Sequence, residues 1–219
     1  MKLSNFIKSS KFIKISIYGV MICSLVILLA LYLNLPSYNL GAGILSYKDK
    51  KYMSENSEFK LEPLKLGKII GKLGRKFIYT IKDNDNYIVA QEILGPTLVY
   101  RKANFSPVYY INLKISSIKI ENEKFFSSSI VSTNKAIIDD LLASLKDPIK
   151  QDSAPSEIIT KLKVYLHSEA LKGLDYYVYV KLDKYNKVFI DEIGDKGELF
   201  LNIPAGPKFS LWINNTKKN

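Results

Sequence analysis

The stretch KLKVYLHSEALKGLDYYVYVKLDKYNKVFIDEIGDKGELFLNIP (residues 161–204) decides the fold. Short runs rich in Val, Tyr, Phe and Ile alternate there with turn signals such as DKYN (183–186). Regularly spaced turns between short β-prone runs are typical of an antiparallel sheet. We therefore expect a C-terminal β-sheet subdomain over residues 158–213, with FSLWI (209–213) as its last strand.

The region before it, residues 66–146, combines the same strand pattern with one helix. Strand-like runs recur through KFIYTIK, YIVAQEIL, TLVYRK and VYYINLKISSIKI, the last of which covers residues 108–120. Apolar residues from Ile137 to Leu145 then recur at helical spacing, which predicts a helix over about 134–146. Strands and helix do not alternate along the chain, so a doubly wound nucleotide-binding fold is disfavoured. The predicted fold class is α+β, a mainly antiparallel β-sheet with one packed helix.

An uncharged apolar segment precedes these regions. Residues 15–35, ISIYGVMICSLVILLALYLNL, would span about 30 Å as a helix, the thickness of a bilayer's hydrocarbon core. We therefore predict a transmembrane helix that contacts membrane lipid. The tail over residues 1–14 carries four lysines and no acid, and the positive-inside rule keeps such a tail in the cytoplasm. The rest of the chain is then extracytoplasmic, at the cell membrane. A signal peptide cleaved near Ala42 is the alternative.

Three further segments complete the expected organisation. Residues 36–65 are rich in breakers and charge, so we expect a stalk that holds the folded part away from the membrane. Residues 147–157, DPIKQDSAPSE, are expected to connect the two β subdomains. Residues 214–219 form a polar tail.

The composition excludes several kinds of chemistry. Cys23, inside the apolar segment, is the single cysteine, so disulfides, Cys-based zinc sites and Cys nucleophiles are excluded from the rest of the chain. The formal net charge of +11 could bring the domain near anionic lipid or an anionic envelope polymer. Lysines spread over a solvated surface explain the same charge. We expect no nucleic-acid partner, no cofactor and no metal.

His167 is the only histidine, so any triad or metal site that needs an imidazole must use it. Its segment alternates as a strand, and an ordinary strand position explains it equally well. The sequence contains no G-x-S-x-G elbow to supply a nucleophile. The catalytic residues therefore stay unknown at this stage.

Carboxylates are the other candidate reactive groups. Glycosidases need two facing acids, and one sheet region carries several, although turns also favour Asp for structural reasons. These candidates are Asp175, Asp183, Asp191, Glu192 and Asp195. Asp83 and Asp85 begin like a calcium loop but lack its Gly and distal Glu.

Two further patterns have structural explanations. Gly67, Gly71 and Gly74 lack the spacing and the hydroxyl of a phosphate-binding loop, so turn or bulge positions explain them better. Alternation places Tyr177 and Tyr179 on one face of a strand, where an exposed aromatic surface would bind a partner.

These observations predict a membrane-anchored extracytoplasmic module that binds a protein, a peptide or a component of the cell envelope, without catalysis. The alternative is a cell-envelope hydrolase with paired carboxylates. That alternative predicts a cleft with two acids, at least one of which has a raised pKa. The binding hypothesis predicts an exposed aromatic patch or an unpaired sheet edge.

Overall fold

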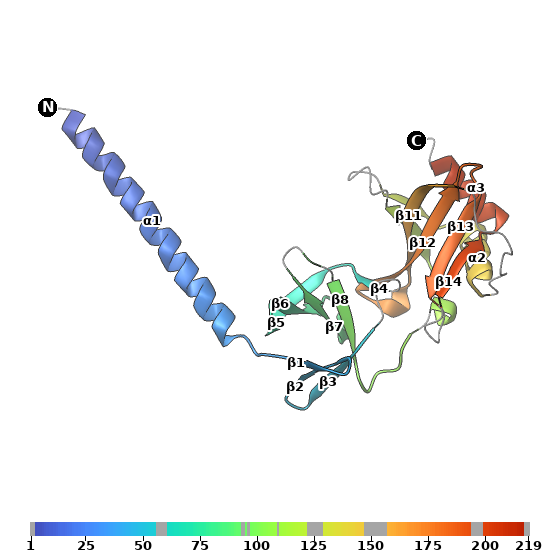
Figure 1. Ribbon diagram of the computed structural model, residues 1–219, viewed down its shortest axis with the longest axis horizontal. Helices are drawn as coiled ribbons and strands as arrows, with labels where there is room; N and C mark the ends of the chain where they lie inside the picture. The colour runs from blue at the N-terminus through green and yellow to red at the C-terminus, as the bar shows by residue number, and fades with distance from the viewer. Residues whose placement is uncertain are drawn as a thin grey trace. The chain divides into compact units, whose positions relative to one another are not determined.

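The chain forms two compact units, residues Met1–Ser37 and Tyr38–Asn219, in a computed structural model (Figure 1). The structure describes residues 3–55, 61–92, 95, 97–108, 110–121, 129–146, 157–193 and 199–216. Within these ranges, side chains are described except at residues 3–17, 111, 192–193 and 199–201.

The first unit consists of one long helix, α1 (Leu3–Asn34). Its large apolar side chains from Val20 to Leu33 are more than half exposed, with Leu25 at 67%. Among the residues described, no helix is long and apolar enough to cross a membrane, and the predicted transmembrane helix over residues 15–35 is not supported by this result.

The second unit is α+β, as predicted, with strands that pair in an antiparallel manner in two sheets. The first sheet has the order β1-β2-β3-β8-β7-β6-β5. Its strands are β1 (Asn39–Gly41), β2 (Ile44–Tyr47), β3 (Lys50–Ser54), β5 (Leu66–Leu73), β6 (Lys76–Ile81), β7 (Asn84–Gln91) and β8 (Thr97–Lys102).

The first sheet curves around a small core of its own. Buried side chains from β2, β3, β6, β7 and β8 meet there, together with Tyr38, whose ring lies 5.2 Å from that of Tyr47. The backbone N–H of Tyr38 donates a 2.8 Å hydrogen bond to the carbonyl of Lys72 at the end of β5. The chain just before β1 therefore lies beside the strand at the opposite edge of the sheet.

These strands correct the expected stalk over residues 36–65. Tyr38, Leu45 and Tyr52 are buried, and β1, β2 and β3 are ordinary members of the first sheet. Among the described charged residues, Lys48 and Asp49 lie at the turn between β2 and β3, and Lys50 and Lys51 lie at exposed positions of β3. The polar composition therefore concealed three short strands, because β2 and β3 each have a single buried residue, Leu45 and Tyr52, and β1 has none.

The second sheet has the order β10-β9-β11-β12-β13-β14, with β4 also paired to β12. Its strands are β4 (Leu61–Pro63), β9 (Ser117–Glu121), β10 (Ile130–Ser132), β11 (Ile158–His167), β12 (Leu174–Asp183), β13 (Val188–Ile193) and β14 (Leu199–Pro204). Two short 3₁₀ helices, η1 (Tyr110–Asn112) and η2 (Glu169–Leu171), flank β9 and β11. Val108 and residues 110–116, predicted as part of a strand, instead form loop and η1, and β9 begins only at Ser117.

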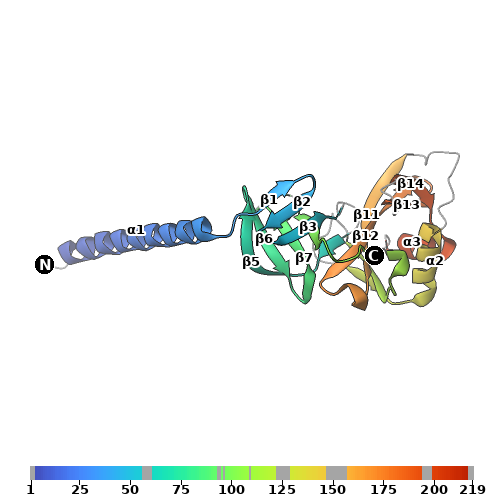
Figure 2. The same cartoon turned by 90° about the horizontal axis from the view of Figure 1, so that it is seen from below.

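Two helices cover one face of the second sheet (Figures 1 and 2). Helix α2 (Lys135–Lys146) confirms the helix predicted at 134–146, and Asn134 Oδ1 accepts a hydrogen bond from the N–H of Ala136 at its start. Helix α3 (Pro207–Thr216) packs beside α2. The main core joins both helices to the inward residues of β9, β11 and β12 and to β7 and β8 of the first sheet.

Helix α3 also corrects two predictions. The FSLWI segment is helical, not a strand, and Asn214 to Thr216 belong to the same helix and not to a tail. The start of α3 is fixed by α2, because Asp140 Oδ2 accepts from the N–H of Phe209 at 2.9 Å. Pro207 occupies the first helical position, where its missing N–H costs nothing.

The division into subdomains at 147–157 stays a prediction, because residues 147–156 lie outside the described residues. Apart from β4, which pairs with β12, the change from the first sheet to the second falls between β8 and β9. The two sheets contact each other directly, since Asn84 Nδ2 on β7 donates to the carbonyl of Lys172, shortly before β12.

Candidate functional site

The candidate site lies on the face of the second sheet that is turned away from α2 and α3. Alternate residues of β11 and β12, such as Val164 and Val178, enter the core, so their neighbours in sequence lie on this outer face. Cross-strand register aligns Tyr165 with Lys119 on one side and Tyr177 on the other. The outer face comprises Glu62, Lys119, Glu121, Lys163, Tyr165, His167, Asp175, Tyr177, Tyr179, Lys181 and Asp191.

Tyr165 is the central residue of this face. Its hydroxyl lies 2.8 Å from Oε2 of Glu121 and 3.1 Å from Oε2 of Glu62, so one phenol links carboxylates from β9 and β4. The two carboxylate oxygens therefore lie within two hydrogen-bond lengths of each other. Burial of the ring and both carboxylates raise the pKa of the Tyr165 hydroxyl well above its usual range, so Tyr165 is a permanent donor.

Two lysines balance these two acids. Lys119 Nζ lies 3.0 Å from Oε1 of Glu121, and Lys163 Nζ is paired with Oε2 of Glu62. The Lys163 ammonium also lies 4.0 Å from the centre of the Tyr177 ring and 5.1 Å from that of Tyr165. The aromatic rings thus hold the lysine stems and heads in place.

The aromatic surface predicted from Tyr177 and Tyr179 is formed but covered. The rings of Tyr165 and Tyr177 lie 6.0 Å apart and those of Tyr177 and Tyr179 lie 5.8 Å apart. Tyr177 is only 5% exposed and Tyr179 is half-buried, so these two rings do not form an open aromatic patch. They serve instead as a packed support beneath the charged groups.

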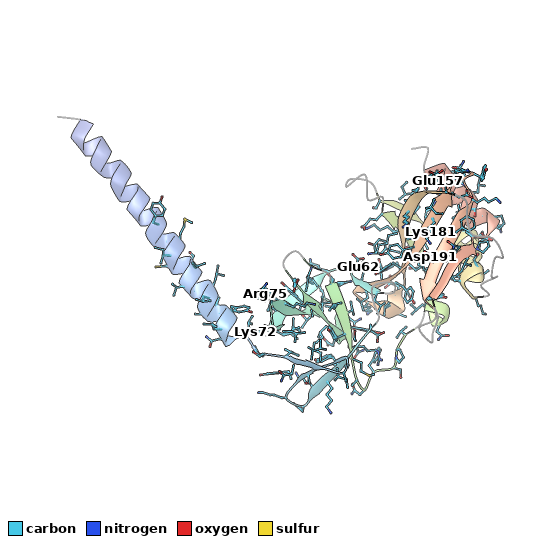
Figure 3. All side chains as sticks on the ribbon, viewed as in Figure 1. Glu62, Lys72, Arg75, Glu157, Lys181 and Asp191 are labelled. Atoms are coloured by element: carbon cyan, nitrogen blue, oxygen red, sulfur yellow. The ribbon has the colours of Figure 1, made fainter. Side chains whose placement is uncertain are left out.

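An open pocket of about 180 Å³ lies beside Tyr165. It is lined by Glu62, Pro63, Leu64, Lys119, Glu121, Tyr165 and Asp175. Three of these side chains are carboxylates, and they come from three different strands. Figure 3 shows Glu62 on β4, close to where the two sheets meet.

The environment shifts the pKa values of two pocket acids in opposite directions. Burial raises the pKa of Asp175, although the hydrogen bond and charge of His167 oppose the rise. Burial acts on Glu121 too, but hydrogen bonds from Lys119 and Tyr165 and the charge of Lys163 lower its pKa on balance. Glu121 is therefore held ionised, and Asp175 is the pocket acid that takes up a proton more readily.

His167, the candidate imidazole, ends β11 and is half-buried. Its Nδ1 lies 2.8 Å from Oδ1 of Asp175, and its Nε2 lies 3.7 Å from Oε1 of Glu169. The pair resembles two members of a catalytic triad, but in the described part of the chain no hydroxyl is seen bonded to Nε2. The geometry gives His167 a positioning role for Asp175.

The other carboxylates named from the sequence lie elsewhere. Asp183 is buried and accepts hydrogen bonds from the N–H groups of Tyr185 and Lys187, so it shapes the β12–β13 turn. Asp191 pairs with Lys181 at 2.5 Å, and Figure 3 shows the two on the second sheet. Asp195 and the side chain of Glu192 lie outside the described residues.

The remaining motifs are structural, as expected. Asp83 lies in the β6–β7 turn with φ of +64°, and Gly74 lies in the β5–β6 turn with φ of +55°. Gly67 is in a stretch where the β5–β6 register shifts, and a Cβ there would meet Thr80 Oγ1 at 2.3 Å. The residues described contain no group of three or more acids, histidines or cysteines that could hold a metal ion.

Sequence reasoning named Asp175 and His167 but missed Glu62, Glu121, Tyr165 and Lys163. Glu62 was assigned to a stalk, and Glu121 ends a strand whose partner was not evident. The alternation of Lys163, Tyr165 and His167 along one strand was the available signal. Comparison with protein-family models, curated proteins and solved structures gives no match to this chain.

Proposed function

We propose that this chain is a membrane-anchored extracytoplasmic binding module, with the outer-face pocket of the second sheet as its binding site. The anchor is the apolar segment of residues 15–35, and the N-terminal tail lies in the cytoplasm. Support for the anchor comes from the uncharged sequence, the lysines before it and the exposed apolar side chains of α1. The ligand is a protein, a peptide or a component of the cell envelope.

The observation that carries the binding role is the tethering of Glu121. Lys119 and the Tyr165 hydroxyl both hold this carboxylate at the pocket and keep it ionised. Such a fixed acceptor next to lysine donors suits recognition of a polar ligand that presents both an amine or hydroxyl donor and an acidic group. Because the rings of Tyr165 and Tyr177 are packed, the site loses little freedom when a ligand binds.

Capture of envelope fragments by the full chain tests this role. The chain in detergent is offered peptides, short glycans and polyglycerol phosphate, and bound ligand is measured for wild type, Glu121→Gln and Asp139→Asn. Asp139 is the matched control, since it too is an exposed acid paired with a lysine, on α2. We expect binding of one class to weaken about tenfold in Glu121→Gln and to stay unchanged in Asp139→Asn. Equal binding by all three proteins would place the ligand elsewhere.

Protease treatment of intact cells tests the anchor independently. The second unit should be digested from outside while the N-terminal tail stays protected. Protection of the second unit in intact cells, with digestion after lysis, would contradict the proposed topology.

A second candidate is a cell-envelope hydrolase with paired carboxylates. The specific observation in its favour is that Asp175 and Glu121 line one pocket with pKa values shifted apart, as a proton donor and an ionised partner require. Against it, each carboxylate already has a fixed partner in His167, Lys119 or Lys163. Turnover of a wall glycan that is abolished by Asp175→Ala or Glu121→Ala would favour the hydrolase over the binding module.

A further inference from the structure

The start of the folded unit limits how far it can lie from the proposed anchor. Helix α1 ends at Asn34, and Tyr38 is already buried in the core of the first sheet. The four steps of chain from Asn34 to Tyr38 reach about 14 Å at full extension. The expected stalk would have allowed a far greater separation. If the segment of residues 15–35 is in the bilayer, Tyr38 lies close to the headgroups whatever the orientation of the domain.

Backbone hydrogen bonds show which part of the folded unit lies next to Tyr38. The N–H of Tyr38 donates to the carbonyl of Lys72, so the end of β5 lies next to the attachment point. Leu73 pairs with Lys76, which leaves Gly74 and Arg75 as a two-residue hairpin turn. Gly74 has φ of +55°, as the first residue of a tight β-turn of this kind requires. The turn between β5 and β6 therefore lies beside Tyr38.

This hairpin is the most one-sided charged segment of the domain. Residues 65–82 carry Lys65, Lys68, Lys72, Arg75, Lys76 and Lys82, with no acid among them. Arg75 is exposed at the tip, and Lys72 and Lys76 flank the turn on the paired strands. Figure 3 labels Lys72 and Arg75 on this hairpin. Cations this close to an anionic surface act within about one Debye length, roughly 10 Å at 0.1 M salt.

We propose that the β5–β6 turn, with Lys72, Arg75 and Lys76, binds the phosphate groups of anionic lipids next to the anchor. The inference rests on the proposed function, because it requires residues 15–35 to be in the membrane. Lipid is favoured over a wall polymer because the short tether fixes the turn near the bilayer surface. The consequence is a second contact with the membrane, which restricts the domain's orientation and the direction in which its pocket opens.

Amide hydrogen exchange on the full chain in lipid nanodiscs tests the proposal. Discs of neutral phosphatidylcholine are compared with discs that contain phosphatidylglycerol, at low and high salt. Exchange at the β5–β6 turn should slow by about fivefold or more in the anionic discs and recover at high salt. The double variant Arg75→Gln, Lys76→Gln should lose this protection.

The matched control is Lys184→Gln, Lys187→Gln, which removes two exposed cations from the β12–β13 turn of the second sheet. It should keep the protection of the β5–β6 turn. Unchanged exchange within β12 shows that each variant is folded. Equal exchange of the wild-type turn in both kinds of disc overturns the proposal and leaves the anchor intact.

Two other results of the nanodisc experiment would also contradict the proposal. A chain that does not remain with the discs overturns the anchor and this inference together. Polyglycerol phosphate, added to the neutral discs, distinguishes the phosphate source. Protection by this polymer but not by phosphatidylglycerol overturns the assignment to lipid and identifies the turn as a polymer contact.

Discussion

Nδ1 of His167 lies 2.8 Å from Oδ1 of Asp175, so the only imidazole of the chain supports a buried carboxylate at the edge of the pocket. Asp175 is 5% exposed, whereas His167 is half-buried with Nε2 facing Glu169. The arrangement makes Asp175 the acid whose protonation changes the pocket, and His167 the residue that holds it in place.

Two substitutions of Asp175 should distinguish the contribution of its hydrogen bond to stability from the contribution of its charge. Asp175→Ala leaves the imidazole N–H without its acceptor, and we expect the free energy of unfolding to fall by about 1–3 kcal/mol. Asp175→Asn keeps an acceptor oxygen and should cost less. Urea unfolding of the purified chain at pH 7 measures both. An alanine variant as stable as the asparagine variant would mean that the hydrogen bond contributes little.

The raised pKa of Asp175 fixes the direction in which the free energy of unfolding changes with pH. Burial raises the pKa of Asp175 above its ordinary value of 3.8, so the native state binds this proton more tightly than the unfolded state. Its contribution to stability is therefore complete below about pH 3.8 and is lost as the pH rises through the native pKa. The stability of Asp175→Asn, taken as its difference from wild type, should therefore shift in favour of the variant as the pH rises from 4 to 7. Parallel stability curves for the two proteins would contradict the shift.

Removal of one hydroxyl should loosen the pair of acids at the pocket. In Tyr165→Phe the ring is kept, but Glu62 and Glu121 lose their shared donor. We expect a loss of about 1–2 kcal/mol in unfolding free energy and a rise in the pKa of Glu121, measured by NMR titration. Tyr185→Phe is the control, because Tyr185 is 67% exposed at the β12–β13 turn.

Glu121 should affect the pH dependence of stability in the opposite direction to Asp175. The pKa of Glu121 is lowered from 4.5, so its stabilising contribution is present above about pH 4.5 and is lost as the pH falls through the native value. Because Tyr165→Phe should raise the native pKa of Glu121, the variant should lose this stabilisation at a higher pH than wild type. If the acid transition does not change, Lys119 and Lys163 hold the Glu121 carboxylate ionised without the Tyr165 hydroxyl.

Much of the fold was predictable because the second sheet follows simple alternation. Strands β11 and β12 place Val164 and Val178 inward and Tyr165 and Tyr177 outward, which is the pattern their sequences predict. The site was less predictable, because it needs Glu62 from a strand of three residues embedded in a polar segment. Such a short strand has too few positions for a periodic signal, and its partner β12 is more than a hundred residues away.

The contact between the two sheets depends on Gly173. It adopts φ of +74°, and a Cβ there would lie 2.3 Å from the carbonyl oxygen of Lys82. Gly173→Ala should therefore lower the free energy of unfolding by about 3 kcal/mol or more, since strain and clash add. Gly74→Ala is the matched control, with φ of +55° and open space around the new methyl group, and should cost about 1 kcal/mol. Equal losses would mean that the sheets can separate at Gly173.

Tyr38 tests whether the folded unit begins where the structure places it. The side chain is 6% exposed and packs in the core of the first sheet. Tyr38→Ala should cost about 3–5 kcal/mol in urea unfolding, as for other large buried rings. Tyr185→Ala, at an exposed turn, should cost less than about 0.5 kcal/mol. A neutral Tyr38→Ala would restore the stalk that the sequence predicted for residues 36–65.

In the FSLWI segment, one residue, Leu211, would face a different side in a strand than it does in a helix. A strand would place Phe209, Leu211 and Ile213 on one face, which is why the alternation predicted a strand. A helix places only Phe209 and Ile213 together, and both are fully buried while Leu211 is 63% exposed. A segment of five residues is too short for its apolar spacing to separate the strand period from the helix period. The helix is favoured by contacts with α2, because Ser144 Oγ accepts from the N–H of Gly206 and Asp140 Oδ2 accepts from the N–H of Phe209 at the start of α3.

Two substitutions in this segment should therefore differ sharply. Phe209→Ala removes a ring from the core and should cost about 3–5 kcal/mol, whereas Leu211→Lys should change stability by less than about 0.5 kcal/mol. A third variant, Asp140→Ala, removes the acceptor at the start of α3 and should cost about 1 kcal/mol. Urea unfolding gives all three values. A loss for Leu211→Lys as large as that for Phe209→Ala would mean that Leu211 faces the core, as a strand requires and the helix forbids.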